Sequence, residues 1–443
     1  MASRTAPSDP LAAWLARQRW FASKTRRIVA VEREDRIPIG SAAIDVLAVT
    51  LDDGVTDRYA VPLAGAALPV DALDDPAFAR ALLALVDAGG RARGERGGLT
   101  SLRTPAFPRD LAGDLSAQRL IGEQSNTSIV FDRALIMKFF RRLTPGTNPD
   151  LEITRFLTER TRFRHTPRLA GALEYTAPDL EPTTLAVIQE LVVDARDGWR
   201  WLLDALGRRE AALSDLRRLG ERTAGLHLAL ATPTDDPAFA AEPIAAADLD
   251  TWAADVVRQV ESARAALADR VLPEVASARA GLAGLLGRLK LRHHGDYHLG
   301  QTLRVDATAD FMIIDFEGEP LRPMAERRRK HTPLRDVAGL LRSLAYAAAT
   351  AARDGDAQWT AAWEPAARAA FLAGYREAAG DAPFLPSLAG GFDAAVAVFE
   401  VEKAAYEIVY EANNRPDWIE IPVGGLVRAS ASLRLPHAPA GAA

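Results

Sequence analysis

The residues best suited to chemistry cluster between Leu291 and Pro320, where the sequence reads LRHHGDYHLGQTLRVDATADFMIIDFEGEP. This segment carries six carboxylates and three of the seven histidines of the chain, beside short apolar runs. Asp296 lies in a glycine-containing loop, Gln301 follows five residues later, and Asp315 ends an apolar run. One carboxylate can accept a proton from a hydroxyl while a second carboxylate and an amide oxygen hold magnesium on nucleotide phosphates. The segment therefore predicts the side chains that phosphoryl transfer needs.

A second group of candidate residues lies upstream. Residues 122–128, GEQSNTS, have the small and hydrogen-bonding side chains that let backbone amides approach phosphate oxygens, although most such stretches are only turns. Lys138 interrupts the apolar run ALIMKFF, where strand alternation places it on the face of Ile136 and Phe140. A lysine in such a run is costly unless it is paired. Glu152, early in the next predicted helix, is the expected partner.

A zinc or two-metal hydrolase site is the alternative interpretation of the histidine-rich loop. His294, Asp296 and His298 alternate along the sequence and would share one face of a strand. Gly295 and the continuation Leu-Gly-Gln make the segment unlike a ligand strand, and no distant histidine-rich segment completes such a site. We therefore expect the histidines to shape the loop by hydrogen bonding.

The elements that position these groups begin with a mixed region. The pattern predicts an amphipathic helix at Trp14–Arg26, a hairpin of strands 43–51 and 58–63, and a helix that ends near Gly89. The Gly- and Arg-rich stretch that follows, up to Gly98, is typical of a mobile link. This part predicts a small α+β domain.

Short strands follow Arg119, and helical patterns dominate the second half of the chain. The run Leu185–Val193 is typical of an apolar strand, and Asp197 is expected to cap the helix that follows it. Apolar residues at helical spacing predict further long helices at 333–353, 359–380 and 392–412. A strand-rich half therefore precedes a helical half.

The totals limit the class of protein. A chain of 443 residues is long for one hydrophobic core, so two or three domains or lobes are expected. The net charge of −5 gives no general attraction to nucleic acid or anionic lipid. The absence of cysteine excludes disulfides, thiolate zinc sites and cysteine nucleophiles. Neither a signal peptide pattern nor a long apolar run is present, so we expect a cytoplasmic protein without nucleic acid or membrane partners.

The motifs HGDYHLGQ and IIDFEGEP together resemble the catalytic and metal loops of the kinase-like phosphotransferases. Within that superfamily the chain resembles the aminoglycoside phosphotransferases and, more closely, the maltokinases. The resemblance extends to GEQSNTS, to the Lys138 strand, and to the segments WLARQRWFASKTR, FRRLTPGTNPDLEITRFLTE, ERRRKHTPLRDVAGLLRS and YEANNRPDWIEIP. It implies a bilobal α+β kinase-like fold. The implied parts are an N-terminal cap domain (1–110), a β-rich nucleotide-binding lobe (111–195) and a helical catalytic and acceptor-binding lobe (196–443).

Carried over position by position, the resemblance implies that Asp296 is the base for the acceptor hydroxyl. Gln301 and Asp315 would hold Mg²⁺, and Glu317 is a further candidate because the motif reads DFE where protein kinases have DFG. Lys138 would contact the phosphates of ATP and pair with Glu152. The phosphate loop, which lacks the G-x-G-x-x-G pattern, and the adenine hinge would supply the other nucleotide contacts: Gln124, Ser125, Asn126, Thr127, Ser128, Gln189, Glu190 and Val192.

A sugar-binding wall is expected near YEANNRPDWIEIP, because an indole can stack on a pyranose while carboxylates bind hydroxyls or an amine. The alternative is a helix cap that packs a tryptophan into the core. The candidate acceptor-binding residues are His298, Tyr410, Glu411, Asn414, Arg415, Asp417 and Trp418.

The resemblance implies ATP-dependent phosphorylation of maltose at its anomeric hydroxyl. Glucosamine kinase activity, which phosphorylates the 6-hydroxyl of glucosamine, is the main alternative. An amine would favour a carboxylate-lined pocket, and a disaccharide would favour a longer, aromatic one. A catalytically silent sugar- or nucleotide-binding regulator is an alternative of another class. The joint presence of Asp296, Gln301, Asp315 and Lys138 argues against it.

Overall fold

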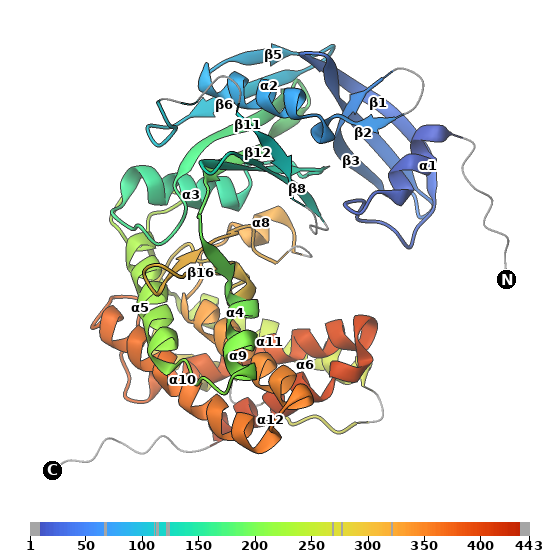
Figure 1. Cartoon of the computed structure of the whole chain (residues 1–443). Coiled ribbons are helices and arrows are strands. Elements are labelled where there is room, and N and C mark those ends of the chain that lie inside the picture. Colours follow the sequence, from blue (N-terminus) through green and yellow to red (C-terminus); the bar gives the residue numbers. More distant parts are fainter. Residues whose placement is uncertain are drawn as a thin grey trace. The chain divides into compact units, whose positions relative to one another are not determined.

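The computed structural model describes residues 9–65, 69–109, 111, 115–120, 125–267, 270–275, 278–319 and 322–434. They form two compact units. The first contains the described residues up to Arg160 together with Pro167–Val193, and the second contains Thr161–Thr166 together with the chain from Asp194 onward. Strands dominate the first unit and helices the second (Figure 1), so the predicted α+β order of strands before helices is confirmed.

One sheet of the first unit contains the predicted hairpin. Strands β2 and β3 pair antiparallel, with Ala43 opposite Leu63, as the sequence predicted. The long strand β1 was not predicted, because its central residues VEREDR are charged and mask the alternation. The sheet has the order β1-β2-β3-β10, with β4 also on β3, and its strands are β1 (Ile28–Ile39), β2 (Ala42–Leu51), β3 (Thr56–Ala64), β4 (Val70–Asp71) and β10 (Arg142–Leu143).

The predicted N-terminal helix is too long at its C-terminal end. Helix α1 (Pro10–Arg17) is capped by Asp9 and ends where Gln18 adopts an extended conformation. The two aromatic anchors after it pack outside the helix: the rings of Trp20 and Phe21 lie 5.9 Å and 5.3 Å from that of Tyr59. Burial of these rings against the sheet outweighs the helical pattern.

The stretch from Gly89 to Gly98 is not the mobile link that its composition suggested. It contains strand β5 and a turn that is held by the buried carboxylate of Asp35. Asp35 accepts hydrogen bonds from the amides of Arg96 (2.9 Å) and Gly97 (2.7 Å) and from the hydroxyl of Tyr175 (2.9 Å). These hydrogen bonds keep its pKa below the usual range although burial acts to raise it. The turn is therefore fixed by a tertiary contact.

The second sheet of the first unit has the order β5-β6-β11-β12-β9-β8-β7. Its strands are β5 (Arg91–Arg93), β6 (Gly98–Arg103), β7 (Ala117–Arg119), β8 (Asn126–Phe131), β9 (Leu135–Phe140), β11 (Leu169–Ala177) and β12 (Leu180–Glu190). Helix α2 (Pro76–Asp87) contributes Phe78, Leu82 and Val86 to the core of this sheet, and α3 (Pro149–Arg160) packs near β11 and β12. Strands on both sides of residue 110 share the sheet, and the domain boundary proposed there stays a prediction.

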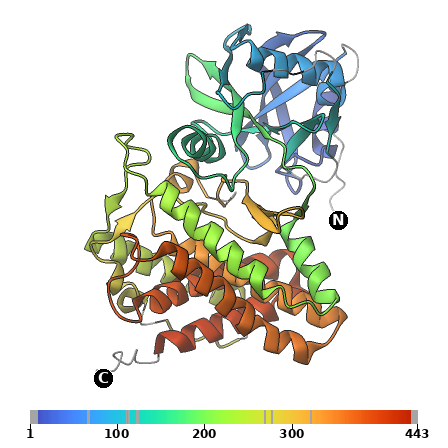
Figure 2. The same cartoon turned by 60° about the vertical axis from the view of Figure 1, so that its left-hand side comes forward.

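The second unit is a helical bundle with small strands at one part of its surface. Its long helices are α4 (Gly198–Gly207), α5 (Leu213–Leu230), α6 (Ala246–Ala266), α9 (Leu334–Asp354), α10 (Ala357–Ala379), α11 (Gly391–Asn414) and α12 (Glu420–Arg434). The helices predicted at 333–353, 359–380 and 392–412 are confirmed, and Asp197 caps α4 by accepting from the amide of Arg200 at 2.9 Å. Figure 2 shows α5 lying across the orange and red helices.

Glycines set the closest helix contact in this unit. Helices α5 and α10 pack against each other, and a Cβ atom at Gly374 would lie 1.9 Å from the carbonyl oxygen of Arg217. A Cβ atom at Gly220 would similarly lie 2.1 Å from the carbonyl oxygen of Phe371. Only glycine permits this approach of the two backbones.

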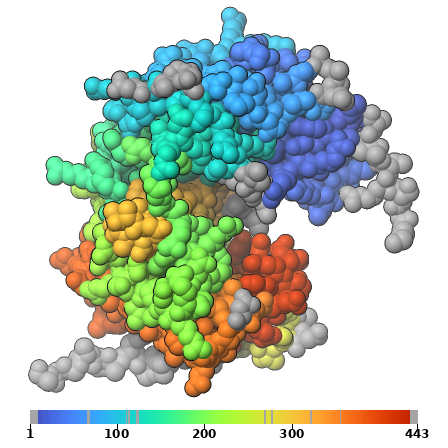
Figure 3. Space-filling model, in the orientation of Figure 1, coloured from blue at the N-terminus to red at the C-terminus, as the bar shows by residue number. Residues whose placement is uncertain are grey.

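Short elements of the second unit carry the segment that the sequence singled out. The strands form two small sheets, one of β13 (Ala195–Asp197), β16 (Thr302–Val305) and β17 (Asp310–Ile313), and one of β14 (Glu242–Pro243) and β15 (Leu289–Lys290). Figure 3 shows the gold β16–β17 turn at the surface beside the green helices. The short helices are α7 (Ala278–Gly281), α8 (Met324–Arg327), η2 (Ala283–Leu285), η3 (Leu299–Gln301) and η4 (Pro416–Trp418), with η1 (Ala72–Asp74) in the first unit. Among the described residues, no helix is long and apolar enough to cross a membrane.

Candidate active site

The loop that carries Asp296 is held from behind by a buried carboxylate. Asp336, in the first turn of α9, accepts hydrogen bonds from the amides of His294 (2.7 Å) and Gly295 (3.0 Å). Gly295 has φ of 86°, a conformation that favours glycine, so the chain can turn here and present Asp296. The hydrogen bonds of Asp336 therefore organise the loop before Asp296.

Asp336 is itself fixed by histidines. His227 of α5 places Nε2 at 3.2 Å from Asp336 Oδ2, and its Nδ1 lies 2.9 Å from the hydroxyl of Tyr375. Burial alone would raise the pKa of Asp336, but the charge of His293 and the hydrogen bond and charge of His227 lower it well below its usual range. The carboxylate therefore remains charged and keeps the loop in place across the range of ordinary working pH.

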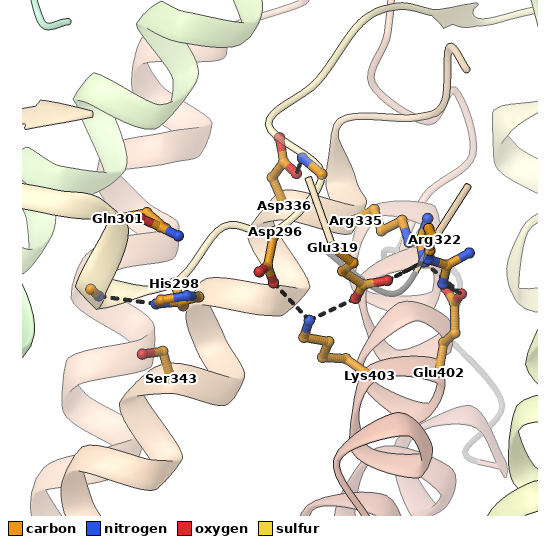
Figure 4. Close-up of polar contacts among 12 residues, drawn as sticks. Asp296, His298, Gln301, Glu319, Arg322, Arg335, Asp336, Ser343, Glu402 and Lys403 are labelled. Atoms are coloured by element: carbon orange, nitrogen blue, oxygen red, sulfur yellow. Dashed lines mark hydrogen bonds and ion pairs between the residues drawn. The ribbon is translucent and has the colours of Figure 1, made fainter. Parts of the chain in front are cut away.

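Lys403 is the functional residue that sequence reasoning missed. It extends from α11, and its Nζ donates to Asp296 Oδ1 at 3.1 Å and to Glu319 Oε1 at 2.7 Å (Figure 4). Burial acts to lower the pKa of Lys403, but Glu319 and Asp296 outweigh it and raise the pKa above its ordinary value. The ammonium group is therefore a permanent positive charge beside Asp296. The available signal was a lysine among buried residues in α11, of the same kind as that noted at Lys138.

Glu319 contacts two arginines in addition to Lys403. It accepts from Arg322 Nε, and Arg335 Nη2 lies 4.0 Å from its Oε2. The two arginines also contact Glu402 Oε1, at 3.4 Å from Arg322 and 2.8 Å from Arg335. Burial would raise the pKa of Glu319, but Lys403, Arg335 and Arg322 lower it well below its usual range. The cluster is a closed network of ion pairs.

The two predicted magnesium ligands lie together. Gln301, at the end of η3, donates from Nε2 to Asp315 Oδ2 at 2.8 Å, and Asp315 adopts a left-handed φ of 67°. An amide that rotates and a carboxylate at this separation offer the hard oxygen ligands that Mg²⁺ prefers, so the residues fit the ion. The backbone carbonyl oxygen of Glu317 accepts a hydrogen bond from Arg327 Nη1 at 3.2 Å.

His294 and His298 of the loop form hydrogen bonds with the backbone. His294 Nε2 lies 2.9 Å from the carbonyl oxygen of Ile314, and His298 Nδ1 accepts from the amide of Gly300 at 3.1 Å. Burial lowers the pKa of His298 although Asp296 acts to raise it. Within the part of the chain that the structure describes, no group of three or more His, Cys, Asp or Glu is arranged to hold a metal ion.

The predicted sugar wall forms a second polar cluster at the end of α11. Glu411 is buried, accepts from Arg415 Nη2 at 2.7 Å and Nε at 2.9 Å, and also accepts from the Tyr346 hydroxyl at 3.0 Å. Trp418 stacks with Tyr346 at a ring distance of 6.3 Å, and the guanidinium of Arg353 lies 4.3 Å from its ring centre. Protein groups thus contact part of this indole, which is half-buried.

The remaining wall residues are at the surface of the second unit. Tyr410, Asn414 and Asp417 are exposed, and Asn414 donates to the carbonyl oxygen of Tyr410 at 2.8 Å. A small cavity of about 20 Å³ beside Asp296 is lined instead by Lys403 and Tyr406, among others, and not by Tyr410 or Trp418. The structure therefore brings Asp296 together with one turn of α11 that precedes the predicted wall.

The predicted nucleotide residues belong to the first unit. Lys138 lies in β9 opposite Ser128 of β8, with Nζ 5.5 Å from the ring centre of Phe140, so the predicted strand face is confirmed. Its Nζ is 3.5 Å from Asp150 Oδ2 at the start of α3. Asp150 is thus a carboxylate partner of Lys138, and the expected pairing with Glu152 stays a prediction.

The phosphate loop and the hinge are described in part. Gln124 lies outside the described residues, Ser125 is exposed, and Asn126, Thr127 and Ser128 begin β8. In the hinge, Gln189 and Glu190 end β12, and the amide of Leu191 donates to the carbonyl oxygen of Ala134 at 2.8 Å. Val192 follows outside the strand and is half-buried. The predicted hinge thus lies at the C-terminal end of β12, an inner strand of the sheet.

Comparisons with known proteins identify close relatives. The maltokinase N-terminal cap domain family matches residues 14–93. A glucosamine kinase of Mycolicibacterium smegmatis is 31% identical over 325 residues, which cover 69% of this chain and 77% of that protein. A glucosamine kinase of Streptacidiphilus jiangxiensis is 28% identical over 324 residues, which cover 68% of this chain and 71% of that protein.

Solved structures agree on the fold. A glucosamine kinase in its crystal form B matches with a TM-score of 0.70 at 24% identity, over 96% of this chain and 97% of that chain. A glucosamine kinase in complex with glucosamine, ADP and inorganic phosphate matches with a TM-score of 0.66, at the same identity and coverage. The kinase-like fold with an N-terminal cap is thereby confirmed.

Proposed function

We propose that this chain, which belongs to the maltokinase-like sugar kinase family that includes the glucosamine kinases, phosphorylates maltose at its anomeric hydroxyl. The chain is an ATP-dependent phosphotransferase that acts on a sugar hydroxyl. The choice between maltose and glucosamine depends on the charge that the acceptor meets, because glucosamine carries an ammonium group near neutral pH and maltose is neutral.

The observation that supports maltose is the neutralisation of the carboxylates around Asp296. Lys403 Nζ lies 3.1 Å from Asp296 Oδ1, and Glu319 forms ion pairs with Lys403, Arg322 and Arg335. None of these acidic groups is left to receive a substrate ammonium, and Lys403 would repel one. A neutral sugar meets no such penalty, since its hydroxyls can donate to the carboxylates and accept from the lysine.

The next turns of α11 continue the same pattern. Glu407 accepts from Arg342 at 2.8 Å and 2.9 Å, and Glu411 is held by Arg415 and Tyr346. Tyr406 lines the cavity beside Asp296, and Tyr346 of α9 stacks with Trp418 of η4, which follows α11. Aromatic rings beside balanced charge suit the second sugar ring of a disaccharide.

In the proposed reaction Asp296 accepts the proton of the attacking hydroxyl, and Lys403 keeps its carboxylate oriented. Gln301 and Asp315 hold Mg²⁺, which when bound neutralises charge on the nucleotide phosphates. Lys138 and residues 124–128 of the first unit bind the phosphates of ATP, Glu152 pairs with Lys138, and Gln189, Glu190 and Val192 contact the adenine. The chemistry requires positioning and charge balance, with no protein nucleophile.

Glucosamine is the second candidate because the relatives from Mycolicibacterium smegmatis and Streptacidiphilus jiangxiensis are glucosamine kinases. Asp417, which is exposed beside Trp418, is the carboxylate best placed to attract an amine in that case. A sugar bound there with its amine on Asp417 would also have to bring a hydroxyl to Asp296.

The test measures ADP release with ATP and Mg²⁺ over a panel of maltose, glucosamine, glucose and an aminoglycoside. We expect the highest kcat/KM with maltose. Turnover of glucosamine without turnover of maltose would replace the proposed acceptor. No turnover with any sugar would favour a silent sugar- or nucleotide-binding regulator instead.

The base assignment has its own test. Asp296→Asn should leave the Kd of ATP unchanged within about twofold and lower kcat by at least about a thousandfold. Asp306→Asn, in the exposed β16–β17 turn, is the matched control and should keep the wild-type rate. A near wild-type rate for Asp296→Asn would overturn the assignment.

A further inference from the structure

A second cavity lies in the helical unit, outside the cluster around Asp296. It has a volume of about 500 Å³, compared with about 20 Å³ for the cavity beside Asp296. Its walls come from the start of α6, from β14 and β15, and from the segment 328–330 that follows α8. No residue in these walls has been assigned a role in the phosphotransfer reaction.

Basic side chains dominate the lining of this cavity. Its cations are Lys290, Arg292, Arg328, Arg329 and Lys330, and its acidic groups are Glu242 and Asp248. The lining therefore carries an excess of positive charge in a protein whose net charge is −5. A local field of opposite sign to that of the whole chain favours an anionic ligand.

Each carboxylate of the cavity is already occupied by a lysine. Lys290 Nζ lies 2.7 Å from Asp248 Oδ1, and Lys330 donates to Glu242 and to the carbonyl oxygen of Pro237. The hydrogen bond from Lys330 holds the pKa of Glu242 below its usual range. These pairs fix the lysines at the mouth of the cavity. The exposed Arg329 adds a cation to the same lining.

Thr251 and Trp252 also line the cavity and suit a ligand that carries hydroxyl groups. Trp252 lines it, and its indole stacks on His331 at a ring distance of 3.9 Å and an angle of 24°, so the ring is held rigidly. Thr251 adds a hydroxyl next to this indole. A volume of 500 Å³ exceeds what a phosphate ion needs and accommodates a sugar ring beside the phosphate.

The walls of this cavity lead directly into the active-site segments. Leu291, next to Lys290, exchanges two backbone hydrogen bonds of 2.9 Å with His331, next to Lys330. Downstream of Leu291 the chain reaches Asp296, and upstream of the 328–330 segment it carries Glu319. A ligand that bridges the two walls would therefore steady both strands that lead to the Asp296, Lys403 and Glu319 cluster.

We propose that this cavity is a second ligand site, which binds a small phosphorylated sugar through its basic wall. The cations bind the phosphate, while Thr251 and the lysine-paired carboxylates receive hydroxyls. The site is distinct from the proposed acceptor site, and the proposal does not depend on whether maltose or glucosamine is the substrate.

The test measures binding by isothermal titration calorimetry on the full chain, in EDTA and without nucleotide, so that no metal-dependent phosphate binding contributes. The probes are glucose 1-phosphate, inorganic phosphate and unphosphorylated glucose at constant ionic strength. We expect glucose 1-phosphate to bind at least tenfold more tightly than either of the other probes. Equal binding of glucose and glucose 1-phosphate, or no binding of glucose 1-phosphate, would overturn the proposal, and equal binding of inorganic phosphate would overturn the sugar assignment.

Two variants locate the site. Arg329→Glu changes an exposed side chain, so the fold is preserved, and it should raise the Kd of glucose 1-phosphate at least tenfold. Arg258→Glu is the matched control, because Arg258 is an exposed arginine of the neighbouring helix α6 outside the cavity, and it should leave the Kd unchanged. An Arg329→Glu protein that binds like the wild type would show that the ligand binds elsewhere and would overturn the assignment.

Discussion

Lys403 Nζ lies 3.1 Å from Asp296 Oδ1 and 2.7 Å from Glu319 Oε1, so one ammonium group joins the proposed base to a buried carboxylate. Lys403 is far in sequence from the other two residues and meets them because α11 passes beside the catalytic loop. The contact orients Asp296 and also decides which charges an acceptor sugar encounters. Most of the predictions below follow from this contact.

Lys403→Met should lower kcat/KM for the acceptor sugar and leave the KM for ATP unchanged. A hydrogen bond between charged groups contributes about 1.5–3 kcal/mol, which corresponds to about 10- to 100-fold in rate. Glu319 keeps Arg322 and Arg335 as partners, so the protein should still fold. Steady-state kinetics on the purified variant provide the measurement.

The matched control for this variant is Arg368→Met, which removes a different ion pair of the same helix. Arg368 binds Glu400 of α11 at 2.7 Å and does not contact Asp296. An equal loss of activity in both variants would show that Lys403 acts only through the stability of α11. Lys403→Met should also increase the activity with glucosamine relative to maltose, since the repelling charge is gone.

Glu319→Gln should destabilise the protein at neutral pH. Removal of one member of a buried ion pair costs about 3–5 kcal/mol, and here three cations lose their shared partner. Because folding lowers the pKa of Glu319 below its ordinary value of 4.5, its stabilisation is complete above that pH and is lost as the pH falls below it. Urea unfolding at pH 7 and pH 4 should therefore show a smaller difference between variant and wild type at pH 4. A constant difference would contradict the assignment of the pKa shift.

His293 gives a pH dependence in a higher and separate window. Its side chain is buried, and burial lowers its pKa from 6.5 to about 4. The folded state therefore binds this proton less readily than the unfolded state, so stability is lost as the pH falls from about 6.5 toward 4. One such group removes about 1 kcal/mol between pH 7.5 and pH 5.5.

The variant His293→Gln lacks this titration and should lose about 1 kcal/mol less than the wild type over the same interval. Both unfolding free energies are measured by urea denaturation at pH 7.5 and pH 5.5. His165→Gln is a comparison at a less buried histidine whose pKa is also lowered. An unchanged slope in His293→Gln would show that folding does not lower the pKa of this imidazole.

Gln301→Ala should raise the Mg²⁺ concentration that gives half-maximal activity by about tenfold, because an oxygen ligand beside Asp315 is lost. The measurement is a Mg²⁺ titration of the initial rate at fixed, saturating ATP. The KM of the acceptor should remain within about twofold of the wild type. An unchanged Mg²⁺ requirement would exclude Gln301 as a ligand.

The sequence predicted those parts of the site that lie close together along the chain. Asp296, Gln301 and Asp315 fall within one loop and one hairpin, so motif spacing located them, and the helices after residue 333 followed from apolar periodicity. Lys403 and Asp336 could not be assigned in this way, because their partners depend on how α9 and α11 pack against the loop. Neither residue has a local pattern that names its partner.

The same reason explains the errors in the first unit. Strand β1 has a charged centre, and its pairing with β2 depends on a partner that the local pattern does not show. The Gly- and Arg-rich stretch after Gly89 looked like a link because its anchor, Asp35, lies more than 60 residues away. Composition reports local preference, whereas β1 is held by its pairing with β2 and the turn by the carboxylate of Asp35.

The most direct test of the central claim is a competition experiment with the unmodified protein. Equimolar maltose and glucosamine are incubated with ATP and Mg²⁺, and the products are identified by ³¹P NMR. We expect phosphate to appear on the anomeric oxygen of maltose, with little glucosamine product. A product that is predominantly glucosamine phosphorylated at its primary hydroxyl would contradict it.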